Sequence, residues 1–272
     1  MTHVLKIGGG RGIDGDAALR NLAERIQRGE RWVLVHGASA AADTLAEQVG
    51  YPARTLTTQS GHTSRYTDPR TLEIFCAAAA SVNQQLTAQL TSLGVRAVGL
   101  AGPNVIRARR KAALRALVNG RQVMVRDDYT GTITGVNGDL LSLLLDEGYT
   151  PVIAPVALGE EGERLNVDGD LAAANIANVL NGETLIILSN VPGLLRNPED
   201  PSSLISSFNL NELERYEHFA NGRMKKKLLA AQTAQTERVI LSDARIEQPL
   251  DVALAGAGTH IYAGERHVEY AS

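Results

Sequence analysis

Short apolar runs alternate with segments of helical periodicity along most of this chain. The apolar runs predict buried strands, and leucines and isoleucines that recur every three or four positions predict helices packed against them. Because strands alternate with helices, we expect an α/β fold, a three-layer αβα sandwich whose mostly parallel central sheet is covered on both faces. The expected strands cover residues 3–7, 32–35, 96–100, 151–154, 185–188, 239–241 and 260–262.

The longest helical segment, at residues 69–93, has clear ends. Asp68 can cap its first turn, Pro69 suits the first helical position and Gly94 suits the exit. The other helices are expected at residues 19–26, 40–49, 140–147, 171–180, 224–235 and 250–255.

Two alternating segments, 122–126 and 130–134, flank Asp127-Asp128-Tyr129 and predict a β-hairpin. The chain shows neither an internal repeat nor an obvious linker. We therefore expect two lobes that share one continuous sheet, residues 1–175 and residues 176–272.

Composition narrows the class of protein. Hydrophobic residues make up 44% of the 272, which is enough to bury a core in two lobes. The net charge of −3 argues against binding nucleic acid or membranes through overall charge. Cys76 is the single cysteine, so a disulfide framework and a thiolate zinc cluster are excluded. Without a signal-peptide pattern or an apolar stretch of roughly 20 residues, a soluble cytoplasmic protein is expected.

Lysine is rare in this chain, and its positions are informative. Only five of the 27 basic residues are lysines, at positions 6, 111, 225, 226 and 227. Lys6 precedes Gly8-Gly9-Gly10 at the end of the first expected strand. Glycines there let backbone N–H groups approach an anion, although a plain strand-to-helix turn also uses them. A lysine on an otherwise buried strand needs an anionic partner, which favours a phosphate site.

Further segments place polar residues or glycines at the ends of expected elements. Arg65 could grip a carboxylate, or could pair with Asp68 on the surface. Asp168 and Asp170 could cap a helix, orient nearby lysines or bind Mg²⁺. The cations of Gly222–Lys227 oppose the helix dipole, which suggests an anionic ligand, with a solvated basic face as the alternative for Lys225 and Lys226.

Taken in order, these segments resemble the amino acid kinase family, and within it the acetylglutamate kinase-like group. The resemblance implies the amino acid kinase fold and transfer of a phosphoryl group from ATP, with Mg²⁺, to a carboxylate. It rests on Lys6–Gly9, Val35–Gly37, Arg65, Asn166–Asp170, Asn190–Gly193 and Gly222–Lys227.

The resemblance also implies a role for each matching residue. Lys6 and Lys227 would flank the transferring phosphoryl group, and Asp170 would organise them. Residues 1–175 would form the substrate lobe with a hairpin lid, and residues 176–272 the nucleotide lobe; the resemblance assigns no metal-binding residue. The phosphates would be held by Gly8, Gly9, Gly37 and Ala38, the amino-acid substrate by Arg65, Asn166, Gly37 and Ala38, and the nucleotide by Ser189, Asn190, Val191 and Gly193.

Departures from the acetylglutamate kinase pattern point to one branch of the family. After His36 the chain has Gly37-Ala38-Ser39-Ala40 where such enzymes have three glycines and a proline. The segments Gly61–Phe75 and Ser242–Arg245 are similar to the branch that phosphorylates α-aminoadipate while a small acidic carrier protein blocks its amino group, in lysine biosynthesis. N-acetylglutamate kinase activity in arginine biosynthesis, a dual role, and a catalytically inactive sensor are the alternatives.

A basic segment and the longest helix bear on partners. Residues 101–126 contain no Asp or Glu, so they form either a solvated basic face or, given the resemblance, a docking face for the acidic carrier protein. The resemblance also implies a homodimer paired through the helix at 69–93, although core packing would explain the apolar stripe of that helix equally well. The expected docking residues are Arg107, Arg109, Arg110, Lys111 and Arg115.

Overall fold

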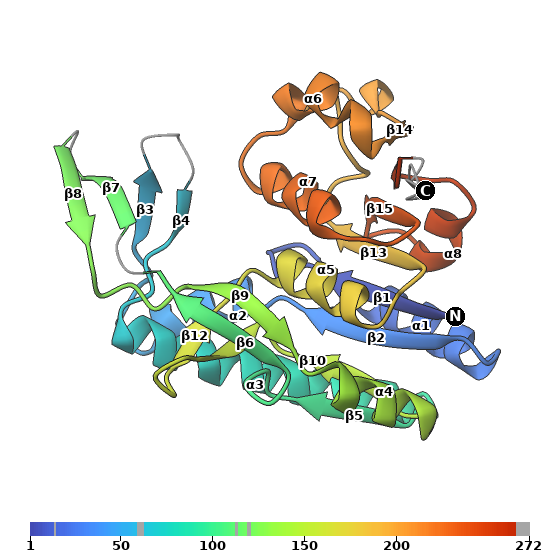
Figure 1. The fold of residues 1–272 in the computed structure, drawn as a ribbon, viewed down its shortest axis with the longest axis horizontal. Helices are drawn as coiled ribbons and strands as arrows, with labels where there is room; N and C mark the ends of the chain where they lie inside the picture. Colours follow the sequence, from blue (N-terminus) through green and yellow to red (C-terminus); the bar gives the residue numbers. More distant parts are fainter. Residues whose placement is uncertain (14, 59–62, 112–113, 119–120, 265–272) are drawn as a thin grey trace, which may run out of the picture.

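An eight-stranded sheet forms the centre of the protein (Figure 1). The computed structural model describes residues 1–13, 15–58, 63–111, 114–118 and 121–264, with side chains described outside 57–64 and 112–123. The strand order is β14-β16-β15-β13-β1-β2-β10-β5. The strands are β1 (Thr2–Ile7), β2 (Arg31–His36), β5 (Ala97–Leu100), β10 (Thr150–Ile153), β13 (Thr184–Ser189), β14 (Ser207–Asn209), β15 (Arg238–Asp243) and β16 (Thr259–Tyr262).

The direction of the strands confirms the predicted α/β class. All neighbouring pairs in this sheet are parallel except β15 and β16. Strands covered on both faces are apolar along most of their length, and all six residues of β13 are buried. Each strand expected from the sequence is present, with bounds that differ by one or two residues.

Helices cover both faces of the sheet, so each buried strand residue points into one of two helical layers. Helices α1, α3 and α8 pack on one face, and α4, α5 and α7 on the other. Successive strand residues point to opposite faces, so Leu5 and Ile7 lie in the first layer and Val4 in the second. Lys6 therefore points toward α5 and α7. The helices are α1 (Asp16–Gln27), α2 (Ser39–Gln48), α3 (Pro69–Ser92), α4 (Gly138–Asp146), α5 (Gly169–Val179), α6 (Leu213–Tyr216), α7 (Arg223–Thr233) and α8 (Pro249–Leu254).

Two four-stranded sheets stand beside the central one, and most of their strands were not predicted. One, here called the side sheet, has the order β12-β11-β6-β9; the other, the projecting sheet, has the order β4-β3-β7-β8 and extends away from the body (Figure 1, upper left). The side sheet comprises β6 (Ile106–Arg110), β9 (Gly131–Val136), β11 (Val156–Gly159) and β12 (Arg164–Asn166), and the projecting sheet β3 (Thr55–Thr58), β4 (Thr63–Arg65), β7 (Leu114–Val118) and β8 (Arg121–Val125).

The hairpin predicted around Asp127–Tyr129 is wrong. Strand β8 pairs with β7, whereas β9 pairs with β6 in the other sheet. An alternating pattern predicts that a segment is a strand but not which strand it pairs with. The buried carboxylate of Asp128 accepts hydrogen bonds from the backbone N–H groups of Thr67 and Thr130, so these residues join two sheets instead of closing a turn.

The two predicted lobes are joined by the central sheet and also by helix α5. Helix α5 continues through residue 175, so it belongs to both sides of the predicted boundary. Strands from residues 1–175 and from residues 176–272 lie next to each other at β1 and β13. Among the described residues, no helix is both long and apolar enough to cross a membrane.

A buried imidazole joins the central sheet to the longest helix. His36, the last residue of β2, is 1% exposed, and its Nε2 lies 3.2 Å from the side-chain nitrogen of Asn83 in α3. Its Nδ1 lies 3.3 Å from the carbonyl oxygen of Gly37, so the neutral ring with its proton on Nδ1 satisfies both contacts. Burial, with Lys6 nearby, lowers the pKa of His36 from 6.5 to about 4.

We expect His36 to make the protein less stable in mild acid. Between a pH of about 4 and 6.5 the ring is neutral in the folded chain and protonated in the unfolded chain, so the free energy of unfolding falls as the pH falls. The contribution is about 2 kcal/mol near pH 5. Urea unfolding of wild type and His36→Gln at several pH values checks this. An equal pH dependence in the two proteins would contradict it.

Candidate active site

Three charged side chains meet near the carboxyl end of β1 with little exposure to solvent. Lys6 comes from β1, Asp170 from the first turn of α5 and Lys227 from α7. Lys6 Nζ lies 2.5 Å from one carboxylate oxygen of Asp170, and Lys227 Nζ lies 3.0 Å from the other. Their exposed fractions are 7%, 5% and 7%. The three residues predicted to be catalytic are thus brought together from positions far apart in the sequence.

One carboxylate shared by two ammonium groups leaves this trio with surplus positive charge. Burial alone would raise the pKa of Asp170, but Lys6 and Lys227 outweigh burial and hold that pKa well below its usual range. Burial lowers the pKa of Lys227, and Asp170 opposes the shift. A buried positive charge that is not fully balanced is costly, so a bound anion would stabilise the site.

The residue two positions earlier, Asp168, fixes the start of α5. One of its carboxylate oxygens accepts the N–H groups of Asp170 at 2.9 Å and Leu171 at 3.2 Å. The other lies 3.2 Å from Lys226 Nζ. Two of the roles considered for this acidic pair are therefore divided between its members: Asp168 caps the helix, and Asp170 contacts the lysines.

Two glycine turns lie against each other at the carboxyl ends of β1 and β2. A Cβ atom on Gly9 would lie 2.2 Å from the carbonyl carbon of Gly37, and one on Gly37 would lie 2.4 Å from the nitrogen of Gly9. Gly9 O also accepts the N–H group of Ala40 at 2.7 Å. Gly8, the next residue of the first turn, donates its N–H group to Leu188 O, and Ala38 is buried beside Gly37. The predicted phosphate-binding residues therefore lie next to one another at the strand ends.

Arg65 and Asn166 lie on different elements, and both contact Thr67. The guanidinium of Arg65 lies 2.5 Å from Asp43 and 3.1 Å from the carbonyl oxygen of Ser39, at the start of α2. The alternative pairing of Arg65 with Asp68 is wrong, since Asp68 pairs with Arg54 instead. The side-chain nitrogen of Asn166 donates to the hydroxyl of Thr67 at 3.2 Å.

The turn predicted to face the nucleotide follows β13, the parallel neighbour of β1, and so lies at the same edge of the sheet as Lys6. Ser189 ends β13 and its carbonyl accepts the N–H group of Ala244. Asn190 is exposed, and Val191 is half-buried. Gly193 packs so closely on Thr259 that a Cβ atom would lie 2.5 Å from its hydroxyl.

The basic residues of the predicted docking face do not behave alike. Arg107 and Arg109 are exposed on β6, where they alternate with buried Ile106 and Ala108. Arg109 also pairs with Glu160, at 3.0 Å. Lys111 is exposed, and Arg115 lies among the residues whose side chains are not described.

Arg110 differs from its neighbours because its guanidinium is bound within the chain by stacking and hydrogen bonds. Its guanidinium stacks on Tyr129, 3.7 Å from the ring centre, and donates to the carbonyl oxygens of Asp128 and Arg126 at 3.0 and 3.2 Å. Its contacts hold the connection between β8 and β9, which is a structural role.

Sequence reasoning missed several polar residues at or near this site. A Cβ atom on Gly10 would lie 2.9 Å from a guanidinium nitrogen of Arg223, so this side chain covers the glycine turn after β1. Arg223 stands in the basic segment already noted, which was the available signal. Thr67 and Asp128 gave no such signal, because each looks like an ordinary loop residue until its contacts are known.

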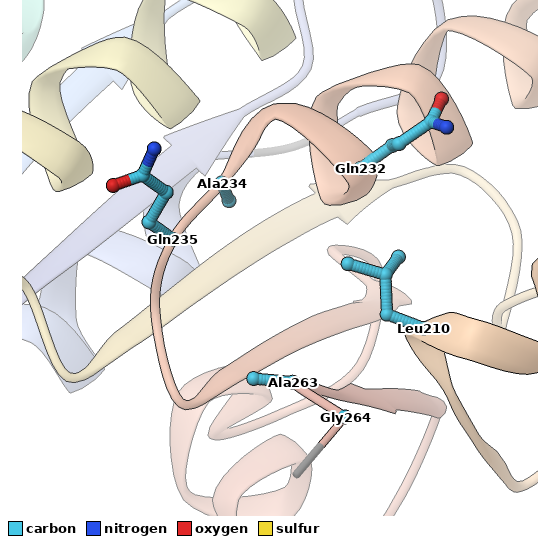
Figure 2. Close-up of a pocket in the computed structure, with 6 residues that line it drawn as sticks. All are labelled: Leu210, Gln232, Ala234, Gln235, Ala263 and Gly264. Atoms are coloured by element: carbon cyan, nitrogen blue, oxygen red, sulfur yellow. The ribbon is translucent and has the colours of Figure 1, made fainter. Parts of the chain in front are cut away.

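A separate hollow lies at the other edge of the central sheet. Ala234 and Gln235 precede β15, and Ala263 follows β16, whose end pairs with the start of β15. Figure 2 shows the lining residues, which come from these loops, from the end of α7 and, for Leu210, from the segment directly after β14. Because Lys6 lies toward the carboxyl end of β1, this hollow is not part of the lysine site. It is lined by Leu210, Gln232, Ala234, Gln235, Ala263 and Gly264.

Comparison with known proteins gives consistent matches over nearly the whole chain. A [LysW]-aminoadipate kinase of Deinococcus radiodurans is 47% identical over 94% of this chain and 90% of its own length. A [LysW]-aminoadipate kinase of Thermus thermophilus is 42% identical over 94% of this chain and 98% of its own. The structure of N-acetylglutamate synthase from Neisseria gonorrhoeae, with coenzyme A and N-acetyl-glutamate, has a TM-score of 0.79 and 25% identity, and covers 97% of this chain and 59% of that one.

The sequence profile of the amino acid kinase family matches residues 1–241. That range contains the two glycine turns, the buried lysines and Asp170. With this match and relatives above 40% identity over almost the full length, the chain belongs to the amino acid kinase family.

Proposed function

We propose that this protein is a kinase that transfers the γ-phosphoryl group of ATP to the side-chain carboxylate of L-2-aminoadipate carried on a small acidic protein, in lysine biosynthesis. The observation that carries the proposal is the buried trio of Lys6, Asp170 and Lys227 beside two glycine turns. The names of the relatives supply the acceptor, since two of them are [LysW]-aminoadipate kinases. ATP as the donor is consistent with an enzyme of the cytoplasm.

The trio suits a transfer that needs charge neutralisation more than proton removal. A carboxylate is ionised near neutral pH, so it attacks phosphorus without a general base. The carboxylate oxygen forms a bond to the γ-phosphorus while the bond to the β-phosphate oxygen breaks, which yields an acyl phosphate and ADP. Lys6 and Lys227 would stabilise the negative charge on the transferring group, and Asp170 would hold them apart at fixed positions.

The described residues fit a Mg²⁺ ion that is held mainly by the nucleotide. They contain no group of three His, Cys, Asp or Glu side chains able to hold a metal. Both oxygens of Asp170 are occupied by lysines, and Asp168 contacts α5 and Lys226. Mg²⁺ in kinases is commonly bound by substrate phosphates and few protein ligands, and it would neutralise phosphate charge here.

The two substrates, the amino-acid acceptor and ATP, would be bound by different parts of the chain. The amino-acid part is assigned to Arg65 and Asn166, with Gly37 and Ala38 beside them, because Arg65 contacts the start of α2 directly after this turn. The guanidinium has five donors, so contacts to Asp43 and Ser39 leave others for a carboxylate. ATP is assigned to residues 176–272, with its phosphates on Gly8 and Gly9 and its nucleoside near the turn at residues 189–193.

The other functions are less well supported. N-acetylglutamate kinase activity is disfavoured by Gly37-Ala38-Ser39, which lacks the three glycines of that group, and by the names of the relatives. An inactive sensor is disfavoured because both lysines and Asp170 are present and paired. ADP release with carrier-linked aminoadipate, N-acetylaminoadipate and N-acetylglutamate separates these functions. The proposal requires the carrier-linked substrate to give the highest kcat/KM.

Replacing either lysine should lower turnover more than it lowers stability. We expect Lys227→Ala and Lys6→Ala to reduce kcat by about a hundredfold or more, the size of effect seen when one positioned electrostatic donor is lost. The remaining lysine still pairs with Asp170, so the fold should persist. Lys225→Ala, which removes an exposed lysine from the same helix, is the matched control. Near-normal turnover of a folded Lys227→Ala protein would exclude the assigned role.

The carrier protein is proposed to dock on the exposed arginines of β6. Arg107 and Arg109 share the exposed face of this strand. Positive charge on this face should attract an acidic protein during encounter. The side sheet that contains β6 also contains β12, which ends at Asn166, so a carrier docked here would lie on the sheet that leads to the assigned substrate residue.

Docking through charge should make the reaction sensitive to salt. We expect the KM for the carrier-linked substrate to rise with added salt, since the screening length falls from about 10 Å at 0.1 M to about 3 Å at 1 M. Small N-acetylated substrates should respond less. Reversing Arg107 and Arg109 together to Glu should raise KM for the carrier-linked substrate only, while reversing exposed Arg20 on α1 and exposed Arg28 directly after that helix should not. Equal loss with both kinds of substrate would contradict docking here.

A homodimer paired through α3 is proposed as well. The support is the resemblance and the length of the helix, which runs from Pro69 to Ser92. Leu72 and Phe75 are buried inside the chain, so part of the apolar stripe already packs internally. Sedimentation at micromolar concentration should show a dimer. A monomer under these conditions would reject the proposal.

A further inference from the structure

The projecting sheet is joined to the body by short connections, and two of these cross. One runs from β4 to α3 and contains Thr67; the other runs from β8 to β9 and contains Asp128 and Tyr129. Thr67 is fully buried and Asp128 is 1% exposed. Buried polar groups at a crossing of two chain segments need partners, and here each has several.

Thr67, Tyr129 and Asn166 form a closed ring of hydrogen bonds, and Asp128 is bonded to this ring through Thr67. One carboxylate oxygen of Asp128 accepts the N–H group of Thr67 at 3.1 Å, and the N–H group of Tyr129 donates to Thr67 O at 2.7 Å. The N–H group of Asn166 donates to Tyr129 O at 2.9 Å. The side chain of Asn166 then donates to the Thr67 hydroxyl at 3.2 Å, which closes the ring.

The Thr67 hydroxyl is the atom that joins the two residues assigned to the amino-acid substrate. It accepts from Asn166 Nδ2 and lies 3.5 Å from the carbonyl oxygen of Arg65, to which it can donate. The orientation of the Asn166 amide is therefore set by this contact. Among the described residues, the Thr67 side chain makes no hydrogen bond to Lys6, Lys227 or the glycine turns, so its influence should fall on the acceptor and not on ATP.

We propose that Thr67, held in place by Asp128, is a positioning residue that sets the geometry of Arg65 and Asn166 and thereby the affinity for the amino-acid acceptor. The inference rests on the proposed function, because that function assigns Arg65 and Asn166 to the acceptor. Thr67 and Asp128 themselves would touch no substrate. This role also makes the base of the projecting sheet part of acceptor recognition.

Arg110 supports this role from outside the ring. Its stacking on Tyr129 and its bond to the carbonyl oxygen of Asp128 hold the second connection against the first. Asp128 also accepts the N–H group of Thr130 at 2.8 Å with its other oxygen. A neutral amide at position 128 could accept only one of these two N–H groups, because its nitrogen is a donor.

The decisive variant is Thr67→Val, which keeps the shape of the side chain and removes the hydroxyl. We expect KM for the acceptor to rise about fivefold or more, the consequence of losing one hydrogen bond at a substrate residue. KM for ATP and kcat at saturating acceptor should stay within about twofold. Thr67→Ser keeps a hydroxyl and should restore KM for the acceptor.

Thr150→Val is the matched control, since Thr150 is also buried but stands at the amino end of β10, away from the site. It should leave both KM values unchanged. Asp128→Asn should raise KM for the acceptor in the same direction as Thr67→Val. If Thr67→Val raises both KM values equally, or changes only the melting temperature, the positioning role is overturned.

The test remains valid if the proposed acceptor is wrong. Wild-type kinetics with the three acceptors decide the proposed function first. The variants are then compared with the acceptor that wild type uses best, or by calorimetric binding of that acceptor if turnover is absent. An unchanged affinity in Thr67→Val overturns this inference alone, whereas a wild type that neither binds nor phosphorylates any of the acceptors overturns both.

Discussion

The organisation of this protein depends on one buried carboxylate that holds two lysines. Asp170 can meet Lys6 and Lys227 only if α5 and α7 cover the same face of the sheet and β1 lies beneath them. An aspartate at the start of a helix is also favoured by the helix dipole, which adds to the effect of the lysines on its charge. The alternation of β1 then decides that Lys6, and not Ile7, points into this layer.

Much of the central sheet could be predicted from the sequence, and the reason is physical. Strands such as β13 are buried on both faces, so their sequences are continuous apolar runs. The start of α3 is equally clear, because Asp68 caps the helix and Pro69 is its first residue. Lys6, Lys227 and the glycine turns stood out as candidates because lysine is rare in the chain and because glycines cluster where strands end, whereas the other candidate residues came from the family resemblance. These signals are local, so they can be recognised in the sequence without knowledge of the fold.

The smaller sheets could not be predicted because their pairing is not local. β11 and β12 have only four and three residues, and β6 is rich in arginine, so neither length nor hydrophobicity marks them. The segments around Asp127–Tyr129 look like two arms of a hairpin, and only the partners β6 and β7 show otherwise. The contact between Thr67 and Asp128 likewise joins segments separated by about sixty residues, so the sequence gives no sign of it.

The contact between Gly9 and Gly37 has a consequence for how such a protein can change. Each position lacks a side chain because the backbone of the other occupies the space. A substitution at one position therefore has no compensating partner, since the residue opposite is already the smallest available. Mutational libraries that vary the residues proposed to bind the acceptor should leave both codons constant and direct diversity to Ala38 and Ser39, where the chain departs from the three glycines typical of acetylglutamate kinases.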